Sequence, residues 1–235
     1  MPDNQIIEQL FDGIAPAYDR MNHLMSFNAD RRWRRLAVRR IADTSKPLQV
    51  LDLATGTGDF AIAIAQKLPT GGHVTGIDLS EKMLAIGRDK VLVEELTDKV
   101  TLLRGNAEAL PFEGGTFDRV TVAFGVRNYG DLRKGLSEAH RMLRDGGKLV
   151  ILELSYPDSR LLLWAYKLYA LKVLPWLGGL ISGDRAAYTY LPESILRFPK
   201  GPAFLTLLRD AGFEHCTEKR LTFGVCRMYL AEKLG

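Results

Sequence analysis

The chain has 235 residues, of which 46% are hydrophobic and 26% charged, and its formal net charge is +4. This length suits one α/β domain with a full core, and the composition is typical of a soluble globular protein rather than a disordered one. Only two cysteines are present, ten positions apart and without zinc-type spacing, which argues against a disulfide framework or a zinc site.

The N-terminal part of the chain combines a start that has acidic but no basic residues with a strongly basic segment. The first residues, MPDNQIIEQLFDG, lack the basic and apolar regions of a signal peptide, so we expect a cytoplasmic protein. Residues 31–40 carry six arginines, while Trp33, Leu36, Ala37 and Ile41 recur at helical spacing. We predict an amphipathic helix whose basic face is either simply solvated or contacts an anionic membrane surface or nucleic acid.

The middle of the chain alternates short apolar runs with helical patterns. This alternation predicts a parallel sheet covered by helices on both faces. The C-terminal segment reads as two further strands around a turn near Gly224, which suits an antiparallel hairpin. The predicted strands of the middle part are 48–54, 73–78, 100–105, 117–123 and 148–155, with helices starting after Ser80 and over 131–144.

The glycine-rich loop TGTGD after the first strand indicates a ligand site at the carboxyl edge of the sheet. GTGDFA fits a dinucleotide fingerprint, with Asp78 twenty residues beyond Gly58, and this alternative predicts an NAD-linked reductase. However, Asp52 stands four residues before Gly56, where the dinucleotide pattern asks for no acid. An acid suits S-adenosylmethionine (SAM), which carries an ammonium and a sulfonium. The polar segment 105–108 follows the third strand, where an adenine would lie, and we therefore favour SAM.

Longer motifs now support a family resemblance. DLATGTGD, GIDLSEKML and GNAEALPFEGGTFD resemble class I SAM-dependent methyltransferases. YDRMNHLMSFNADRRW (18–33) and RMLRDGGKLVILELS (141–155) resemble the two signature segments of the ubiquinone/menaquinone biosynthesis C-methyltransferases. The resemblance extends from about Phe11 to Tyr229, almost the whole chain.

The resemblance implies an α/β fold of the Rossmann-like class I methyltransferase type. The sheet is expected to be seven-stranded and mostly parallel, with an antiparallel C-terminal strand and a helical lid insertion. A single domain over 1–235 is expected, with an N-terminal helical cap at about 1–45 and the insertion at about 157–198.

The implied activity is SAM-dependent C-methylation of a polyprenyl hydroquinone ring. Demethylmenaquinol is the expected substrate, and the benzoquinol step of ubiquinone synthesis is a second one. Two positions depart from the family: Asp30 replaces the usual histidine, which weakens a mechanism needing a base there, and Ala123 replaces the serine of some members, which removes one cofactor hydrogen bond. The residues expected to bind SAM, from the loop and from the resemblance, are Asp52, Gly56, Thr57, Gly58, Asp78, Asn106, Ala107 and Ala123.

The segment AFGVRN at the end of the fourth strand supplies the expected catalytic residues. Arg127 is either an ordinary exposed or ion-paired arginine, or a fixed positive charge that favours the phenolate of the substrate. Because guanidinium stays protonated, it is a poor base. We expect Asn128 to orient the ring oxygen and Asp19, or a water, to take the proton. Tyr18 and Asn22 either shape the substrate pocket or pack between helices.

The apolar segment 161–181 is too short before Pro175 to cross a bilayer. It reads equally well as a core helix or as a lid that accepts an isoprenoid tail. Together with the basic segment 31–40, it predicts peripheral contact with an anionic membrane surface at the inner face of the membrane.

Other functions remain open. A nucleic-acid methyltransferase is the alternative function, encouraged by the arginines, but AFGVRN stands where N-methylases of bases carry a DPPY-type segment. A C5 pyrimidine methylase needs a nucleophilic cysteine, and Cys216 and Cys226 both lie in the C-terminal hairpin. A SAM-binding module without catalysis is a third reading. The expected partners are the polyprenyl hydroquinone and the membrane surface, with no nucleic acid.

Overall fold

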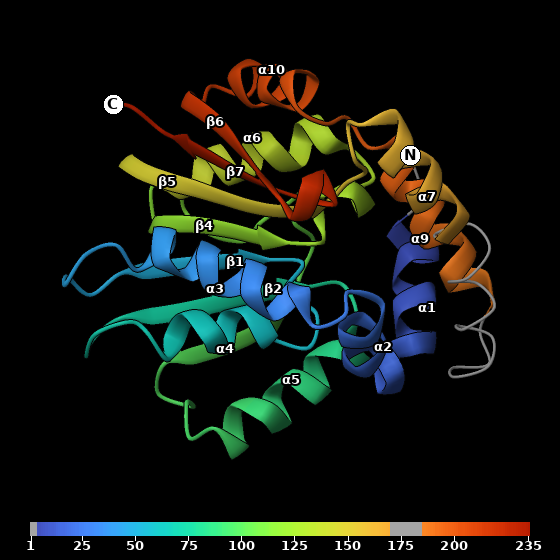
Figure 1. The fold of residues 1–235 in the computed structure, drawn as a ribbon. Helices are drawn as coiled ribbons and strands as arrows, with labels where there is room; N and C mark the ends of the chain where they lie inside the picture. Colours follow the sequence, from blue (N-terminus) through green and yellow to red (C-terminus); the bar gives the residue numbers. More distant parts are fainter. Residues whose placement is uncertain (1–3, 170–184) are drawn as a thin grey trace.

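A single mixed sheet forms the centre of the protein. The computed structural model describes residues 4–169 and 185–235 (Figure 1). Strand order is β3-β2-β1-β4-β5-β7-β6, with β1 to β5 parallel to one another and β7 antiparallel to both β5 and β6. This confirms the predicted mostly parallel sheet with an antiparallel C-terminal strand. The strands are β1 (Gln49–Leu53), β2 (His73–Asp78), β3 (Val100–Arg104), β4 (Phe117–Ala123), β5 (Leu143–Leu154), β6 (Glu214–Leu221) and β7 (Cys226–Glu232).

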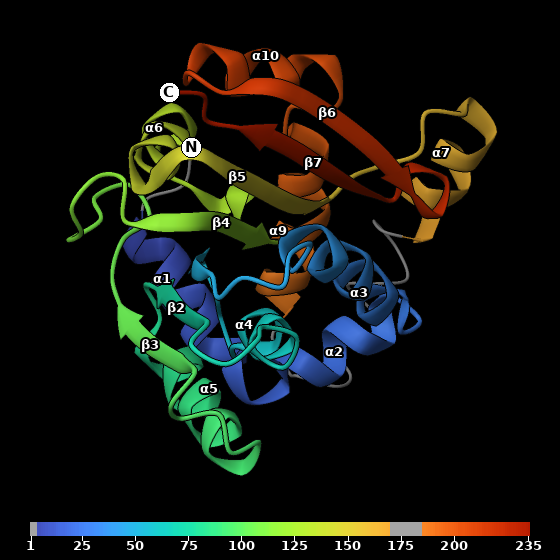
Figure 2. The same cartoon turned by 90° about the vertical axis from the view of Figure 1, so that its left-hand side faces the viewer.

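Helices cover both faces of the sheet and its carboxyl edge (Figures 1 and 2). Buried side chains of α3, α4 and α5 form the core on one face, and those of α6 and α10 form the core on the other. The helices are α1 (Asn4–Ile14), α2 (Tyr18–Met25), α3 (Ala29–Ile41), α4 (Asp59–Ala65), α5 (Glu81–Val93), α6 (Leu132–Met142), α7 (Arg160–Leu168), α9 (Arg185–Arg197) and α10 (Pro202–Asp210).

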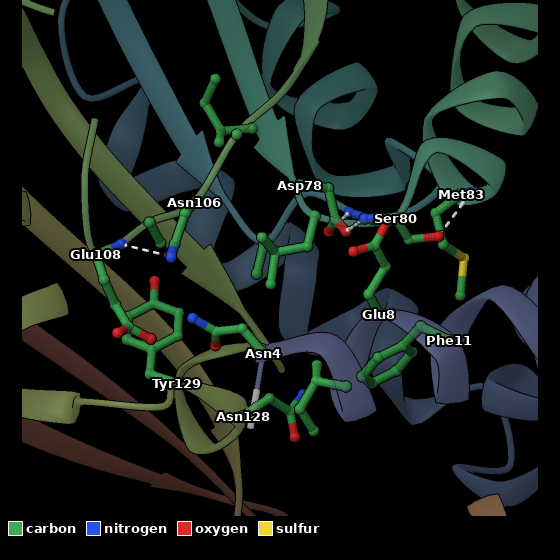
Figure 3. A pocket seen from close by; sticks show the side chains of 18 of the residues that line it. Asn4, Glu8, Phe11, Asp78, Ser80, Met83, Asn106, Glu108, Asn128 and Tyr129 are labelled. Carbon is green, nitrogen blue, oxygen red and sulfur yellow. Dashed lines mark hydrogen bonds between the residues drawn. The ribbon is translucent and has the colours of Figure 1, made fainter. Parts of the chain in front are cut away.

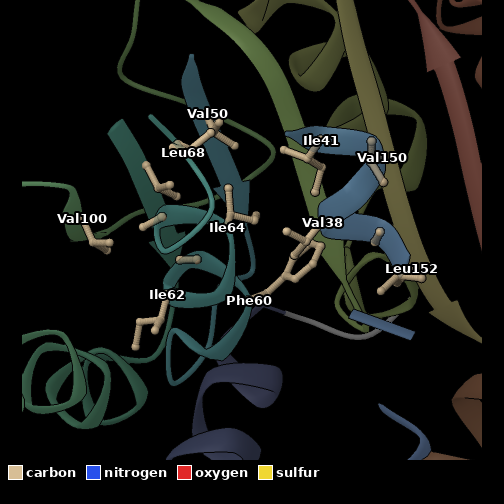
Figure 4. Packing of buried hydrophobic residues seen from close by; sticks show 14 of the residues in the cluster. Val38, Ile41, Val50, Phe60, Ile62, Ile64, Leu68, Val100, Val150 and Leu152 are labelled. Atoms are coloured by element: carbon tan, nitrogen blue, oxygen red, sulfur yellow. The ribbon is translucent and has the colours of Figure 1, made fainter. Parts of the chain in front are cut away.

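The basic segment forms the predicted amphipathic helix, α3. Its apolar stripe, including Trp33, Ala37 and Ile41, is buried against the sheet, and Figure 4 shows the packing of Ile41 near Val150. Burial of each large apolar side chain contributes about 1.5–3 kcal/mol, so this stripe fixes the helix on the sheet. Five arginines lie on the exposed face of the helix: Arg31, Arg32, Arg35, Arg39 and Arg40.

The fifth strand begins earlier than predicted. We expected it at residue 148, but β5 starts at Leu143, which pairs with Phe117, and the register shifts before Arg119 pairs with Lys148. The extra residues include Gly146, whose φ of +76° allows an irregular backbone that a periodicity argument reads as a loop.

The carboxyl ends of β1 to β4 lie under α1, α2 and α9 (Figure 1). The short helix η1 (Ala15–Ala17) also contacts α5, and these contacts help to hold the N-terminal helices over the sheet. No helix in the described ranges combines the length and apolar character that a membrane span requires. Of the apolar segment 161–181, the part beyond residue 169 lies outside the described residues.

Candidate active site

A cavity enclosing about 650 Å³ lies beyond the carboxyl ends of the strands (Figure 3). The loops after β1, β2, β3 and β4 form its floor, and α1 closes it with Asn4, Glu8 and Phe11. The resemblance implied an N-terminal helical cap, but the sequence did not show which residues of the first helix would line this space. We call this space the first cavity.

The glycine loop meets the first cavity at Gly56. This residue has φ +58°, and a Cβ added to it would find only the Tyr18 ring within 4.0 Å, so the backbone can approach a ligand directly. Asp78, also in the wall, receives the Gly56 N–H on Oδ2 at 2.7 Å and the Ser80 N–H on Oδ1 at 2.9 Å. Burial raises the pKa of Asp78, and the backbone N–H donors oppose that rise. The carboxylate thus holds the loop and keeps further lone pairs for a hydroxyl ligand.

Asp52 is not part of the cavity wall, which corrects its assignment to the cofactor. It is 1% exposed and lies beneath the loop, where it receives the hydroxyl protons of Thr55 and Thr121, both at 2.6 Å. Burial raises its pKa to about 6, although these two hydrogen bonds oppose the shift. Asp52 supports the loop from below.

Three other predicted cofactor residues lie outside the walls of both cavities that we describe: Thr57, Gly58 and Ala123. Thr57 donates its hydroxyl to Asp19 Oδ1 at 2.6 Å and receives Lys90 Nζ at 3.1 Å. Gly58 precedes α4 with φ +77°, a conformation that favours glycine. Thr57 and Gly58 shape the loop, and the part of these three residues in SAM binding stays a prediction.

The loop after β3 supplies polar groups to the first cavity, and Asn106 and Ala107, which we expect to bind SAM, both line it. Asn106 Oδ1 receives the Glu108 N–H at 2.9 Å, and Glu108 Oε1 receives the Gly130 N–H at 2.7 Å (Figure 3). The hydroxyl of Tyr129 is buried at the cavity and has no hydrogen-bond partner among the described residues. An unpaired buried hydroxyl is costly, so a polar ligand here would satisfy it.

The first cavity therefore fits SAM. Asp78 can accept the ribose hydroxyls, the Asn106 side-chain amide can bind the adenine edge, and Ile77, Leu79 and Met83 give apolar contact for a ring.

A second, larger cavity of about 1360 Å³ adjoins the first. Its wall is mostly apolar and comes from α1, α2, α3, α7 and α9, together with the turn before β7. Phe11, Tyr18 and Phe124 line both cavities, so the two spaces meet at these aromatic rings. Asn22 lines the second cavity as well.

Arg127 lies in the wall of the second cavity, and its side chain is 4% exposed. Its Nη1 pairs with Glu153 Oε1 at 2.7 Å and also donates to the Phe124 carbonyl, while its backbone N–H donates to Glu153 Oε2 at 3.1 Å. Burial alone would lower the pKa of Arg127, but the Glu153 carboxylate holds it above its ordinary value. Arg127 is ion-paired, as the plainer reading expected, and it is also a buried cation facing a cavity.

The neighbouring predicted residues divide between the two cavities and the surface. Asn128 lines the first cavity, and its Oδ1 receives the Tyr190 hydroxyl at 3.0 Å. Asp19 lines neither cavity, because its carboxylate pairs with Lys90 and receives the Thr57 hydroxyl. Its expected role as proton acceptor is therefore corrected.

The sequence reasoning missed two kinds of residue at this site. Glu153 was detectable in principle, since an acid inside the apolar run LVILEL requires a buried partner. Tyr166, Tyr169 and Tyr190 also line the second cavity. They come from the helices after β5, and no spacing rule connects them with Arg127.

Comparison with known proteins identifies the family. The model of the ubiE/COQ5 methyltransferase family matches residues 2–233. Demethylmenaquinone methyltransferase of Bacteroides fragilis is 45% identical over 97% of this chain and 92% of its own length. That of Thermus thermophilus is 46% identical over 95% of this chain and 100% of its own. The ubiquinone/menaquinone biosynthesis C-methyltransferase UbiE of Geobacter sulfurreducens is 47% identical over 97% and 88%.

Solved structures share the fold. The cyclase SpnF superposes with a TM-score of 0.74 at 19% identity, covering 100% of this chain and 98% of its own. Phosphoethanolamine N-methyltransferase 2 of Haemonchus contortus, in complex with SAM, gives a TM-score of 0.65 at 16% identity, covering 87% and 53%. At these identities the likeness concerns the fold alone.

The raised pKa of Asp52 makes a prediction for stability against pH. An unfolded aspartate ionises near pH 4, whereas Asp52 ionises at about 6 in the folded protein. The folded state therefore holds a proton that the unfolded state has lost, and stability falls as pH rises from about 4 through 6, by up to about 3 kcal/mol. Urea unfolding across this range should show a shallower fall for Asp52→Asn than for the wild type. Equal slopes in the two proteins would contradict the buried, neutral carboxyl.

Asp78→Ala should weaken SAM binding because it removes the acceptor for the ribose and for the Gly56 N–H. Loss of a charged acceptor costs about 1.5–3 kcal/mol, equivalent to a roughly tenfold to hundredfold fall in affinity. Calorimetry with SAM measures this, and Asp118→Asn, in the sheet but away from the cavity wall, is the control. A folded Asp78→Ala protein that binds SAM as tightly as the wild type would refute the assignment.

Proposed function

Because the chain belongs to the ubiE/COQ5 methyltransferase family, we propose that it methylates a ring carbon of a polyprenyl hydroquinone, converting demethylmenaquinol to menaquinol with SAM as methyl donor. The observation that carries this proposal is the pair of cavities. One carries polar groups that fit the donor, the other is larger and mostly apolar, and they meet at Phe11, Tyr18 and Phe124. A nucleic-acid substrate is not favoured, since the acceptor space is mostly apolar.

Bound SAM supplies an electrophilic methyl group on a sulfonium, so the chain has to hold an electron-rich ring against it and exclude water. The wall of the second cavity is mostly apolar and limits contact with water, and we propose that this larger space takes the ring and the first isoprene units. Asn128 lies next to the cavity junction, where we propose that its amide orients the ring oxygen.

Arg127 is proposed to make the ring nucleophilic by favouring the phenolate. The tyrosines around it show how it acts on a phenol. Burial raises the pKa of Tyr18 and raises that of Tyr166 to about 12, and the Arg127 charge opposes the rise in both. A quinol hydroxyl in the same cavity experiences the same field, so Arg127 lowers its pKa relative to an equally buried phenol without this neighbour.

We also propose that the rim of the second cavity contacts an anionic membrane. Phe27 and Thr222 line this cavity, and Phe27 itself is 79% exposed. Beside Thr222, Phe223 is 82% exposed, and on α7 Trp164 is 67% exposed. The exposed arginines of α3 continue from Phe27 along the next helix. Apolar side chains beside a basic face suit the interface of an anionic bilayer, where the substrate itself resides.

Arg127→Ala should lower the methyl-transfer rate roughly 10²–10³-fold, because one preorganised charge at the developing phenolate is lost. Arg127→Lys should recover part of the rate, since a point charge lacks the planar fork. Single-turnover methylation of a short-chain demethylmenaquinol between pH 7 and 10 measures this, and the rate of the alanine variant should rise with pH as more phenolate forms.

In Arg127→Ala, Glu153 stays buried without its ion-pair partner, so the variant needs a control for lost stability. Removing one member of a buried pair destabilises a protein by about 3–5 kcal/mol, so the double variant Arg127→Met, Glu153→Gln is tested beside it. The double variant should be more stable than Arg127→Ala and equally slow. A double variant with the wild-type rate would exclude Arg127 from the chemistry.

Phe223→Ser combined with Trp164→Ser should lower affinity for vesicles containing phosphatidylglycerol by about tenfold or more, the effect of about 1.4 kcal/mol of lost apolar contact. Sedimentation with vesicles measures binding, which salt should also weaken. Leu92→Ser is the matched control, because Leu92 is 66% exposed on α5. Equal losses in the control and the double variant would contradict a specific membrane surface.

A further inference from the structure

Methylation of a ring carbon releases one proton per turnover, and the second cavity needs a route for it. When the carbon–methyl bond forms, the hydrogen on the same carbon leaves as a proton, and its bonding electrons restore the aromatic ring. We propose that Asp30 accepts this proton and that His23 passes it to solvent. This inference rests on the proposed quinol methylation and adds the acceptor that the corrected role of Asp19 leaves open.

Asp30 is the carboxylate that the second cavity offers. Among the described residues that line this cavity it is the only acid. The other ionisable side chains of the wall accept protons poorly: Arg34 and Arg127 are guanidinium ions, and burial raises the pKa of Tyr18, Tyr166, Tyr169 and Tyr190, which keeps them protonated.

Asp30 is connected through Arg34 with the aromatic rings at which the two cavities meet. Arg34 Nη1, which contacts Asp30 Oδ2 at 2.8 Å, belongs to a guanidinium that lies over the Phe124 ring, 5.5 Å from its centroid. Phe124 lines both cavities. Arg34 and Arg127 both lower the pKa of Tyr18, which also lines both cavities. Arg34 therefore joins Asp30 to the residues of this junction, on which the charge of Arg127 also acts.

His23 connects Asp30 with the surface. Its Nδ1 lies 2.8 Å from Asp30 Oδ2, while Ser26 donates its hydroxyl to Asp30 Oδ1 at 2.7 Å. The side chain of His23 is 22% exposed and that of Asp30 only 4%, so the imidazole reaches water that the carboxylate does not. The histidine that the family resemblance places at position 30 is replaced here by an acid, and an imidazole contacts that acid from α2.

The transfer balances in two steps. A proton from the ring carbon, or from the adjacent hydroxyl, moves to an Asp30 carboxylate oxygen. While Asp30 is ionised, the neutral imidazole of His23 donates its Nδ1–H to Oδ2. Once Asp30 is protonated, proton exchange with water moves the imidazole proton from Nδ1 to Nε2, and Nδ1 then accepts the Asp30 proton from Oδ2. The imidazolium releases its Nε2 proton to water, which restores the starting tautomer and the ionised Asp30. The charged groups facing His23 are Asp30 and Arg34 of α3 and, at longer range, Asp59 at the start of α4.

The test uses a short-chain demethylmenaquinol carrying deuterium at the carbon that is methylated. Wild-type turnover should be insensitive to this deuterium, because proton loss follows methyl transfer rapidly. Asp30→Asn should lower turnover roughly 10²-fold, the lower end of the range for general base catalysis, and should introduce a primary isotope effect. Added formate should partly restore the turnover of Asp30→Ala. SAM affinity should remain unchanged in both variants.

His23→Gln keeps the Asp30–Arg34 ion pair and so tests the relay separately from the fold. Its turnover should fall, and added imidazole should partly restore it, because the Asp30 proton then has an acceptor again. His73→Gln, a remote histidine of β2, should keep the wild-type turnover. Wild-type turnover in Asp30→Asn would overturn the inference, and so would a slow Asp30→Asn enzyme with neither isotope effect nor formate rescue. If the wild type fails to methylate the quinol at all, it is the proposed function that fails.

Discussion

The buried ion pair of Arg127 and Glu153 is the interaction on which both cavities depend. It joins the short helix η2 (Val126–Asn128) to β5 through the guanidinium and through the Arg127 backbone N–H. With η2 held in this way, consecutive residues face different spaces: Arg127 the second cavity and Asn128 the first. A buried pair recovers its desolvation cost only with good geometry and additional hydrogen bonds. Glu153 meets that condition, because it also receives the Leu154 N–H at 2.7 Å.

The roof over the first cavity is held by weaker interactions. Carboxylates of the N-terminal helices reach the sheet loops, where Asp12 receives the Ser80 hydroxyl at 2.5 Å and Glu8 pairs with Arg104 at 2.6 Å. Partly exposed contacts of this kind contribute at most about 1 kcal/mol each. Buried groups such as Asp52 therefore stabilise the loops that form the floor of the first cavity. The contacts that hold α1 over this cavity cost little free energy to break. A cofactor enclosed by α1 needs such an arrangement to enter and leave.

The alternation of apolar runs with helical patterns predicted four of the five parallel strands to within one residue of their ends. The sequence also identified Ser80 as the N-cap of α5, where its Oγ receives the Met83 N–H at 3.1 Å. The same alternation could not show that Asp52 lies under the loop whereas Asp78 lies in the cavity wall. Side chains of a strand alternate between faces, so an acid near the end of a strand can lie under the adjoining loop or open into the cavity. Which of these two positions the acid takes depends on the register of its strand with the neighbouring strands. The residues of α1 that line the first cavity could not be predicted either, because this wall arises from contacts between segments far apart in sequence.

Charge balance explains why the activating cation has a carboxylate partner. The sulfonium of SAM is itself positive, and it has to sit at the junction between the cavities. An isolated Arg127 in an apolar wall would repel it strongly, since interactions between charges are weakly screened there. The negative charge of Glu153 offsets most of the repulsion between Arg127 and the sulfonium. In the proposed reaction, the ionised substrate hydroxyl would lie between Arg127 and the sulfonium, while Glu153 remains paired with Arg127 and bound to backbone N–H groups. The same pair thus tolerates the cationic donor in the ground state and favours negative charge on the ring as methyl transfer begins.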